Sequence, residues 1–170
     1  MKNIILIGMP AVGKSTIGSA IARKLGMKYI DTDDVIRKSC MATLPEIIEK
    51  HGRDKFLLIE DRILSQIETT KTVISTGGSA IYGENAMNKL KEGGMVLYLK
   101  ISFEEISKRL KRMKSRGVVI REDQTLKDLY DERCALCEKY ADVTVDMSDF
   151  PPSVGVERCL IALKRAGVVR

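Results

Sequence analysis

The chain has 170 residues, of which 44% are apolar and 31% charged, and its formal net charge is +6. This composition predicts one domain over 1–170 with a single core and excludes a disordered chain. Its apolar runs are too short for a membrane span or a secretory signal, so we expect a cytoplasmic protein. The four cysteines are then expected to be reduced thiols.

The N-terminal part of the chain alternates short apolar runs with helical periodicity. Residues 4–7 form a continuous apolar run, which is typical of a strand buried on both faces of a parallel sheet. Residues 14–25 carry apolar side chains at helical spacing, and residues 29–30 are a second short strand. A capping box formed by Thr43 and Glu46 starts the next helix.

The alternation continues to the C-terminus. The further expected elements, in chain order, are a helix at 56–67, a strand at 72–75, a strand at 95–99, a helix opened by a capping box of Ser102 and Glu105, a helix from about 125, a strand at 143–145 and a helix at 154–163. Five strands alternating with helices predict an α/β fold in which helices cover both faces of a parallel sheet.

A phosphate-binding motif stands between the first strand and the first helix. Residues 8–15 match G-x-x-x-x-G-K-S, in which backbone N–H groups surround phosphate oxygens at a helix N-terminus. Lys14 is expected to reach the β- and γ-phosphates of a nucleotide, and Ser15 to ligate Mg²⁺. The predicted nucleotide-binding residues of this segment are Gly8, Ala11, Val12, Gly13, Lys14, Ser15 and Thr16.

Acidic side chains follow the second strand, at the edge of a parallel sheet where ligands bind. They are Asp31, Asp33 and Asp34. Helix capping is one interpretation of such acids, and we assign that role to Asp34. A magnesium-dependent transferase needs one carboxylate near the metal and another at the acceptor hydroxyl, so we predict these roles for Asp31 and Asp33 respectively.

Two further segments carry chemical information. Residues 76–79 read Thr-Gly-Gly-Ser after the strand at 72–75, and the glycines are either a turn or a place where a ligand approaches the backbone. A basic run without acids indicates a polyanionic partner and comprises Lys108, Arg109, Lys111, Arg112, Lys114 and Arg116. The run has no interleaved aromatic residues, which favours a nucleotide over a nucleic acid.

Together these motifs resemble the shikimate kinase family, which comprises small P-loop kinases of the nucleoside-monophosphate-kinase type. The resemblance covers almost the whole chain. The family motifs G-M-x-x-x-G-K-S/T, D-T-D and G-G-G correspond to residues 8–15, 31–33 and 77–79, with serine as the third residue of the last motif. The resemblance assigns an adenine-stacking arginine to Arg109, a lid arginine to Arg116 and a substrate-binding arginine to Arg133.

The resemblance implies a three-layer α/β/α fold with a five-stranded parallel sheet in the order 2-3-1-4-5. It also implies a substrate-binding helical region at about 32–62 and a lid at about 112–124. The implied reaction transfers the γ-phosphoryl group of ATP, with Mg²⁺, to a hydroxyl of shikimate to give 3-phosphoshikimate, a step of aromatic amino acid biosynthesis. We expect a monomer that binds neither nucleic acid nor membrane.

The resemblance also implies a division of roles within the site. The catalytic residues would be Lys14, Asp33 and Arg116. The nucleotide would be bound by the loop residues together with Arg109 and Arg116, and Mg²⁺ by Ser15 and Asp31. The residues implied to bind the substrate are Asp33, Gly77, Gly78, Ser79 and Arg133.

One departure from the family concerns the substrate. The family segment G-E-x-x-F-R-x-x-E supplies an arginine for the shikimate carboxylate, and this chain has Leu57 at that position. Arg53, four residues earlier, could replace it if the helix extends back that far. Two alternatives therefore stay open. One is a P-loop kinase for a sugar acid, polyol or amino alcohol, and the other is a non-catalytic nucleotide-binding or nucleic-acid-associated protein.

Overall fold

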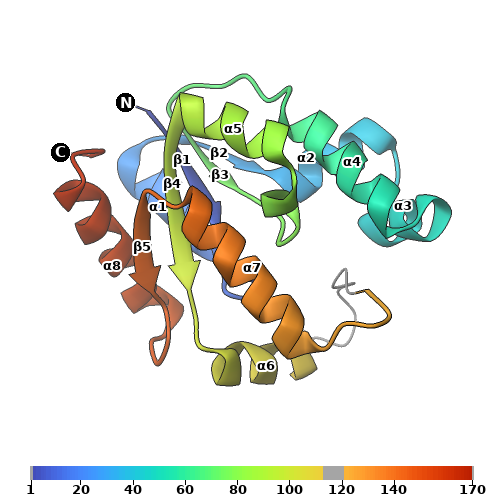
Figure 1. Cartoon of the computed structure of the whole chain (residues 1–170). Coiled ribbons are helices and arrows are strands. Elements are labelled where there is room, and N and C mark those ends of the chain that lie inside the picture. The colour runs from blue at the N-terminus through green and yellow to red at the C-terminus, as the bar shows by residue number, and fades with distance from the viewer. Residues whose placement is uncertain (1, 113–120, 170) are drawn as a thin grey trace.

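Parallel strands form the centre of the computed structural model, which describes residues 2–112 and 121–169 (Figure 1). The sheet in this part of the chain has the order β2-β3-β1-β4-β5, and every neighbouring pair is parallel. This confirms the predicted strand order. The strands are β1 (Asn3–Ile7), β2 (Lys28–Asp31), β3 (Thr72–Ser75), β4 (Gly94–Lys100) and β5 (Val143–Asp146).

Helices cover both faces of the sheet, as the alternating pattern predicts. Helices α1 and α8 pack together on one face, and α5 and α7 contact β4 on the other (Figure 1). The helices are α1 (Lys14–Leu25), α2 (Thr32–Cys40), α3 (Leu44–His51), α4 (Arg53–Leu64), α5 (Glu84–Gly93), α6 (Phe103–Arg112), α7 (Leu126–Tyr140) and α8 (Pro152–Arg165), with a short 3₁₀ helix η1 (Ala80–Tyr82) before α5.

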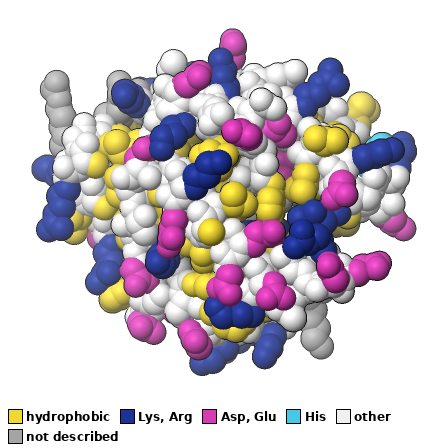
Figure 2. All heavy atoms as spheres, viewed as in Figure 1, with side chains coloured by type: hydrophobic (Ala, Val, Ile, Leu, Met, Phe, Trp, Pro, Cys, Tyr) yellow, Lys and Arg dark blue, Asp and Glu magenta, His cyan; other side chains and the backbone are white. Residues whose placement is uncertain are grey.

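The surface is mixed in charge. On the face seen in Figure 2, lysine and arginine side chains are interspersed with acidic ones. Such interspersion is typical of a solvated surface. Among the described residues, no helix combines the length and the apolar character needed to cross a membrane.

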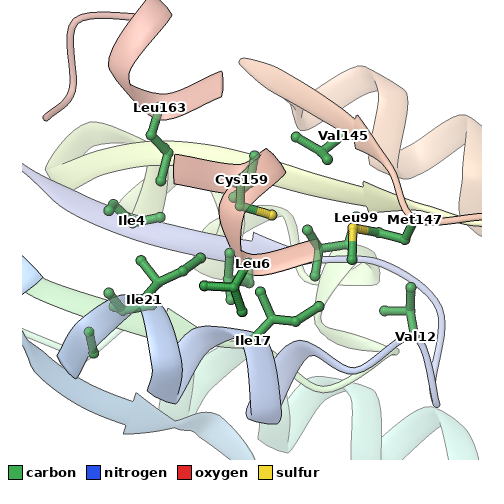
Figure 3. Packing of buried hydrophobic residues seen from close by; sticks show 14 of the residues in the cluster. Ile4, Leu6, Val12, Ile17, Ile21, Leu99, Val145, Met147, Cys159 and Leu163 are labelled. Atoms are coloured by element: carbon green, nitrogen blue, oxygen red, sulfur yellow. The ribbon is translucent and has the colours of Figure 1, made fainter. Parts of the chain in front are cut away.

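The core follows from the alternation of side chains along β1. Ile4 and Leu6 are fully buried on one face, where they meet Ile17 and Ile21 of α1 and Leu163 of α8 (Figure 3). The intervening residues of β1 face the opposite way and pack against α5 and α7. Burial on both faces explains why β1 is a continuous apolar run rather than an alternating one.

A separate hydrophobic cluster holds the helices that follow β2. Ile36 of α2, Ile47 of α3 and Phe56 of α4 are its buried centre, and α4 continues onto α5 and η1. These helices occupy the segment at about 32–62 that the family resemblance assigns to the substrate. Their packing sets α4 beside the carboxyl edge of the sheet.

Two helices were not predicted from periodicity. Among the described residues, α2 buries only Thr32 and Ile36, and α5 buries a short apolar stripe centred on Met87. Most of their side chains are polar, so the apolar stripe is too narrow to stand out in the sequence. Tertiary packing against α4 supplies the stabilisation that the pattern does not reveal.

Two capping predictions were wrong in detail. Asp31, not Asp34, caps α2, because its Oδ1 accepts a hydrogen bond from the Asp33 backbone N–H at 3.0 Å. Asp34 instead forms an ion pair with Arg37. At α6, the Ser102 hydroxyl caps the helix, but the carboxylate of Glu105 completes no box, since it binds Arg109 and the backbone N–H of Asp149.

Candidate active site

The phosphate-binding loop connects β1 to α1. Gly8 and Gly13 have φ angles of 149° and 104°, which residues with a side chain rarely adopt. A Cβ at Gly8 would also lie 2.7 Å from the carbonyl oxygen of Leu99. The first turn of α1 contains no acid and has no side-chain cap, so its backbone N–H groups point toward the loop as donors for an anion.

Lys14 lies inside this loop. Its side chain is only 7% exposed, and Nζ donates hydrogen bonds to the carbonyl oxygens of Gly8 and Met9, both at 2.8 Å. Burial lowers the pKa of Lys14 to about 8, while the nearby charges of Asp33 and Asp31 act in the opposite direction. The ammonium form still predominates at neutral pH, so a cation is held where the motif binds phosphate.

The two predicted metal ligands meet at the start of α1. The hydroxyl of Ser15 donates a hydrogen bond of 2.7 Å to Oδ2 of Asp31, at the end of β2. Hydroxyl and carboxylate oxygens are the donors that Mg²⁺ prefers, and this ion usually takes few protein ligands beside phosphate oxygens and water. The pair therefore fits a Mg²⁺ ion that accompanies a nucleotide.

The paired glycines bring the backbone close to charged side chains. A Cβ at Gly77 would lie 2.7 Å from Oδ1 of Asp33, and a Cβ at Gly78 would lie 2.8 Å from Nη1 of Arg133. The Gly77 N–H also donates to the hydroxyl of Thr32 at 3.0 Å. Glycine is needed at both positions because any side chain here would displace Asp33 or Arg133, and the approach of a ligand to this backbone stays a prediction.

Ser79 is bonded to a buried carboxyl group that sequence reasoning did not single out as a site residue. Its hydroxyl donates to Oε2 of Glu60 at 2.6 Å, and Glu60 is 2% exposed. Burial raises the pKa of Glu60 to about 7, and the charge of Asp33 adds to this while Ser79 and Arg133 oppose it. An acid between Phe56 and Leu64 at helical spacing, where apolar residues are expected, is the signal that could have identified Glu60.

Arg133 brings α7 into the site. It is 2% exposed, and its guanidinium carbon lies 5.5 Å from the centroid of the Tyr82 ring. One cavity joins it to the phosphate-binding loop and to the paired glycines. The residues that line this cavity are Pro10, Ala11, Gly13, Lys14, Ser15, Asp31, Asp33, Leu44, Ile48, Phe56, Thr76, Gly77, Gly78, Ser79 and Arg133.

Most residues predicted for the site thus surround one cavity. Gly8 and Val12 are part of the loop but do not line the cavity, and Thr16 lines an adjoining hollow with Ser15. Leu44, Ile48 and Phe56 form an apolar wall that motif reasoning missed. Their signal in the sequence is indistinguishable from that of ordinary core residues at helical spacing.

The basic run is divided in the structure. Arg109 of α6 lies behind the loop, where Nη1 is 3.3 Å from the carbonyl oxygen of Val12 and Nη2 is 2.5 Å from Oε1 of Glu105. Its stacking on adenine stays a prediction. Lys114 and Arg116 lie outside the described residues, as does most of the lid expected at about 112–124.

A phosphate-binding loop after β1, with carboxylates after β2 on the same edge of a parallel sheet, defines the class of the P-loop kinases that act on small molecules. A cavity that continues from this loop to an arginine and paired glycines adds room for an acceptor. The chain belongs to the shikimate kinase family, since the sequence model of that family, described as "Shikimate kinase", matches residues 10–164. This confirms the family resemblance.

Individual shikimate kinases match this chain over almost their full length. A shikimate kinase from Thermodesulfovibrio yellowstonii is 34% identical over 168 residues, which are 97% of this chain and 96% of the relative. The structure of shikimate kinase from Aquifex aeolicus has 34% identity and a TM-score of 0.81, with 98% of both chains covered. Shikimate kinase from Acinetobacter baumannii in complex with shikimate has 29% identity and a TM-score of 0.86, covering 100% of this chain and 96% of the other.

Proposed function

We propose that this protein is a kinase that transfers the γ-phosphoryl group of ATP to a hydroxyl of shikimate in the presence of Mg²⁺. The observation that carries the proposal is the single cavity that joins Lys14 to Asp33 and Arg133 in a chain of the shikimate kinase family. It provides a cation for the phosphates, a carboxylate for the hydroxyl and a guanidinium for an anionic acceptor.

The nucleotide end of the cavity supplies positive charge. Backbone N–H groups at the start of α1 and the ammonium of Lys14 stabilise the charge that develops on the transferring phosphoryl group. Ser15 and Asp31 would hold Mg²⁺, which neutralises phosphate charge when it is bound. Arg116 is proposed to add a further cation from the lid.

The acceptor end supplies orientation and a proton acceptor. Asp33 lies in the first turn of α2 beside Gly77, and it would accept the proton that leaves the attacking hydroxyl. As the new O–P bond forms, the bond between the γ-phosphorus and the bridging oxygen breaks, and ADP leaves with that electron pair. Arg133 would hold the carboxylate of shikimate through charge-assisted hydrogen bonds.

A substrate panel tests this function. Release of ADP by the wild-type protein is measured with shikimate, gluconate, homoserine and simple polyols at fixed ATP and Mg²⁺. We expect saturable turnover with shikimate alone. Turnover of another acceptor without turnover of shikimate would favour the broader kinase alternative, and ATP binding without turnover of any acceptor would favour the non-catalytic one.

We further propose a cytoplasmic monomer without a nucleic-acid or membrane partner. The cavity already contains the predicted loop lysine, the carboxylates and Arg133, so the proposed site needs no residue from a second copy. Arg109, Lys111 and Arg112 lie in the last turn of α6, where cations stabilise the helix dipole without a polyanion. Light scattering on the purified protein should give a mass near 19.0 kDa, and about twice that value would contradict the monomer.

A further inference from the structure

A second guanidinium lies beside the acceptor end of the cavity. Arg53 is the first residue of α4, and its guanidinium carbon is 5.4 Å from the centroid of the Tyr82 ring. The guanidinium carbon of Arg133 is 5.5 Å from the same centroid. One aromatic ring therefore carries both cations, and cation–π contacts of this kind orient a guanidinium as well as attract it.

The position of Arg53 on α4 directs it toward the site. Phe56 and Glu60 follow it by three and seven residues, so the three side chains share one face of the helix. Phe56 lines the cavity, and Glu60 is bonded to Ser79 at the cavity wall. Arg53 thus lies one helical turn beyond the cavity-lining Phe56, at the end of this face that is nearest the helix start.

Leu57 does not share this role. It packs against the hydrophobic cluster of α2, α3 and α4, and it is absent from the residues that line the cavity. The position that carries an arginine in the family pattern is therefore part of the apolar packing in this chain. Helix α4 begins at Arg53. This meets the condition under which Arg53 could replace the arginine of the family pattern.

Arg53 has hydrogen-bonding capacity to spare. Its ion pair with Asp54 has an N–O distance of 3.2 Å, but the Asp54 side chain is 92% exposed, and such pairs contribute little. Its Nε atom is buried and donates no hydrogen bond within the ranges that the structure describes. A buried donor without an acceptor is costly, so an anion that arrives there is stabilised.

The surrounding charges also favour an anion. The carboxylate of Glu132 accepts a 2.6 Å hydrogen bond from the Tyr82 hydroxyl, and it lies 3.6 Å from Nη2 of Arg121. The hydrogen bond from Tyr82 lowers the pKa of Glu132, and the charges of Arg121 and Arg53 act in the same direction, so Glu132 shares its charge among several partners. The paired carboxylates Asp54 and Asp123 are largely exposed, so the cations Arg53, Arg121 and Arg133 outnumber the local acid, and a ligand with one negative charge would reduce this excess.

We propose that Arg53 is a specificity-determining residue that binds the carboxylate of the acceptor together with Arg133, with Tyr82 holding both guanidiniums in place. This role rests on the proposed function, because it takes shikimate, a carboxylic acid, as the substrate. Two guanidiniums offer paired donors to the two oxygens of one carboxylate. Neither group needs to touch the reacting hydroxyl.

The test compares shikimate with its uncharged methyl ester, in the wild-type protein and in Arg53→Gln. We expect Arg53→Gln to raise the KM for shikimate by about ten- to a hundredfold, the scale of one lost charge-assisted contact. The KM for the ester and the kcat for either acceptor should change less than about threefold. The preference of the enzyme for the acid over the ester should therefore shrink by the same factor.

Matched variants separate recognition from structure. Lys55→Gln removes the same charge from an exposed side chain of the same helical turn, and it should leave both KM values unchanged. Arg53→Lys keeps a cation but loses the planar fork, so the preference for the acid should fall between those of wild type and Arg53→Gln. This variant gives the same comparison if Arg53→Gln lowers the melting temperature.

The possible outcomes are distinct. If Arg53→Gln raises the KM for the acid and for the ester equally, the proposed role of Arg53 is overturned. An unchanged KM for the acid in this variant would overturn it too. Both results leave the proposed function intact. Lack of turnover of shikimate by the wild-type protein would overturn the proposed function and, with it, this assignment. Loss of acid preference in Arg53→Gln alone, with Lys55→Gln unaffected, supports the assignment.

Discussion

At the scale of single residues, Lys14 is the most direct test of the nucleotide end of the site. Lys14→Met keeps most of the side-chain volume but removes the charge that faces the phosphates. We expect kcat to fall about a hundred- to a thousandfold, the cost of one preorganised donor to a transition-state charge. Turnover is measured with saturating ATP and shikimate, and circular dichroism checks the fold. Near-normal turnover in a folded variant would contradict the assignment.

A substitution of Asp33 tests the different roles predicted for Asp31, at the metal, and Asp33, at the acceptor hydroxyl. Asp33→Asn preserves the shape of the side chain but cannot accept the proton of the acceptor hydroxyl. We predict a loss of kcat of about a hundredfold or more, with the Kd for ATP and Mg²⁺ changed less than about threefold. An equal loss of nucleotide affinity, measured by titration calorimetry, would instead move Asp33 to the metal.

Glu60 makes stability depend on pH. Burial raises its pKa from the ordinary 4.5 to about 7, so between these values the folded chain binds a proton that the unfolded chain releases. Stability from this group is therefore lost as pH rises from about 4.5 to about 7, by about 3 kcal/mol in all. The neutral variant Glu60→Gln lacks this loss.

Urea denaturation of the wild type and Glu60→Gln at several pH values tests this. The difference between their free energies of unfolding cancels the contributions of other groups that titrate in the same range. We expect the free energy of unfolding of Glu60→Gln to rise by about 3 kcal/mol relative to that of the wild type between pH 4.5 and pH 8. A difference that does not vary with pH would show that burial does not raise the pKa of Glu60.

Site residues could be predicted from sequence where local geometry alone brings them together. Lys14 and Ser15 belong to one loop, and Asp31 follows a strand that must end at the same edge of the sheet. Glu60 and Phe56 could not be found in this way, and Arg53 was raised only through the family pattern. The position of these residues depends on how α4 packs against η1 and α2, a tertiary arrangement that helical periodicity does not specify.

At the scale of elements, Gly18 sets the distance between α1 and the sheet. A Cβ at this position would lie 2.3 Å from Oγ of Ser75 and 2.8 Å from Cδ1 of Leu6. Gly18→Ala should therefore destabilise the protein by about 1–3 kcal/mol, although alanine favours helices. Ser75 also donates a hydrogen bond of 2.9 Å to the Lys14 carbonyl, so a displaced helix would move the loop.

Gly93→Ala is the matched control for Gly18→Ala. A Cβ at Gly93 would meet only the side-chain nitrogen of Asn3, at an ordinary 3.5 Å. Denaturant unfolding should show no loss of stability in Gly93→Ala and a clear loss in Gly18→Ala. Equal stability of the two variants would mean that α1 moves away from β3 without cost.

Element prediction succeeded where apolar residues recur and failed where polar residues dominate. The strand at 72–75 and the helix at 14–25 were predicted at their observed bounds, because Val73 and Ile74 indicate the strand and apolar side chains recur at helical spacing in the helix. Helices α2 and α5 escaped because tertiary contacts stabilise them. The choice of Asp34 as the cap of α2 failed because Asp31 combines two roles, as a cap and as a partner of Ser15.

At the scale of the whole molecule, the strand order places the two ends of the cavity in different parts of the fold. The nucleotide end lies over β1 at the centre of the sheet, and the acceptor end lies between the helices after β2 and the start of η1. Strand order came from the family resemblance and not from periodicity, since alternating strands and helices are compatible with several orders.

Ligand binding should stabilise the folded chain as a whole. At ATP and Mg²⁺ concentrations about a hundredfold above Kd, the free energy of unfolding rises by about 2.7 kcal/mol, and the Tm by about 5–10 °C. Thermal unfolding with and without the nucleotide measures this. The shift should shrink strongly in Lys14→Met, and an equal shift in the variant would place the nucleotide elsewhere.

Phosphorus NMR of the wild-type protein with ATP, Mg²⁺ and shikimate is the measurement that tests the central claim most directly. We predict that the γ-phosphate signal of ATP is replaced one for one by a phosphomonoester signal on shikimate, and that chelation of Mg²⁺ by EDTA stops the conversion. Consumption of ATP that yields only inorganic phosphate, or no consumption with shikimate present, would contradict the assignment of this protein as a shikimate-phosphorylating kinase.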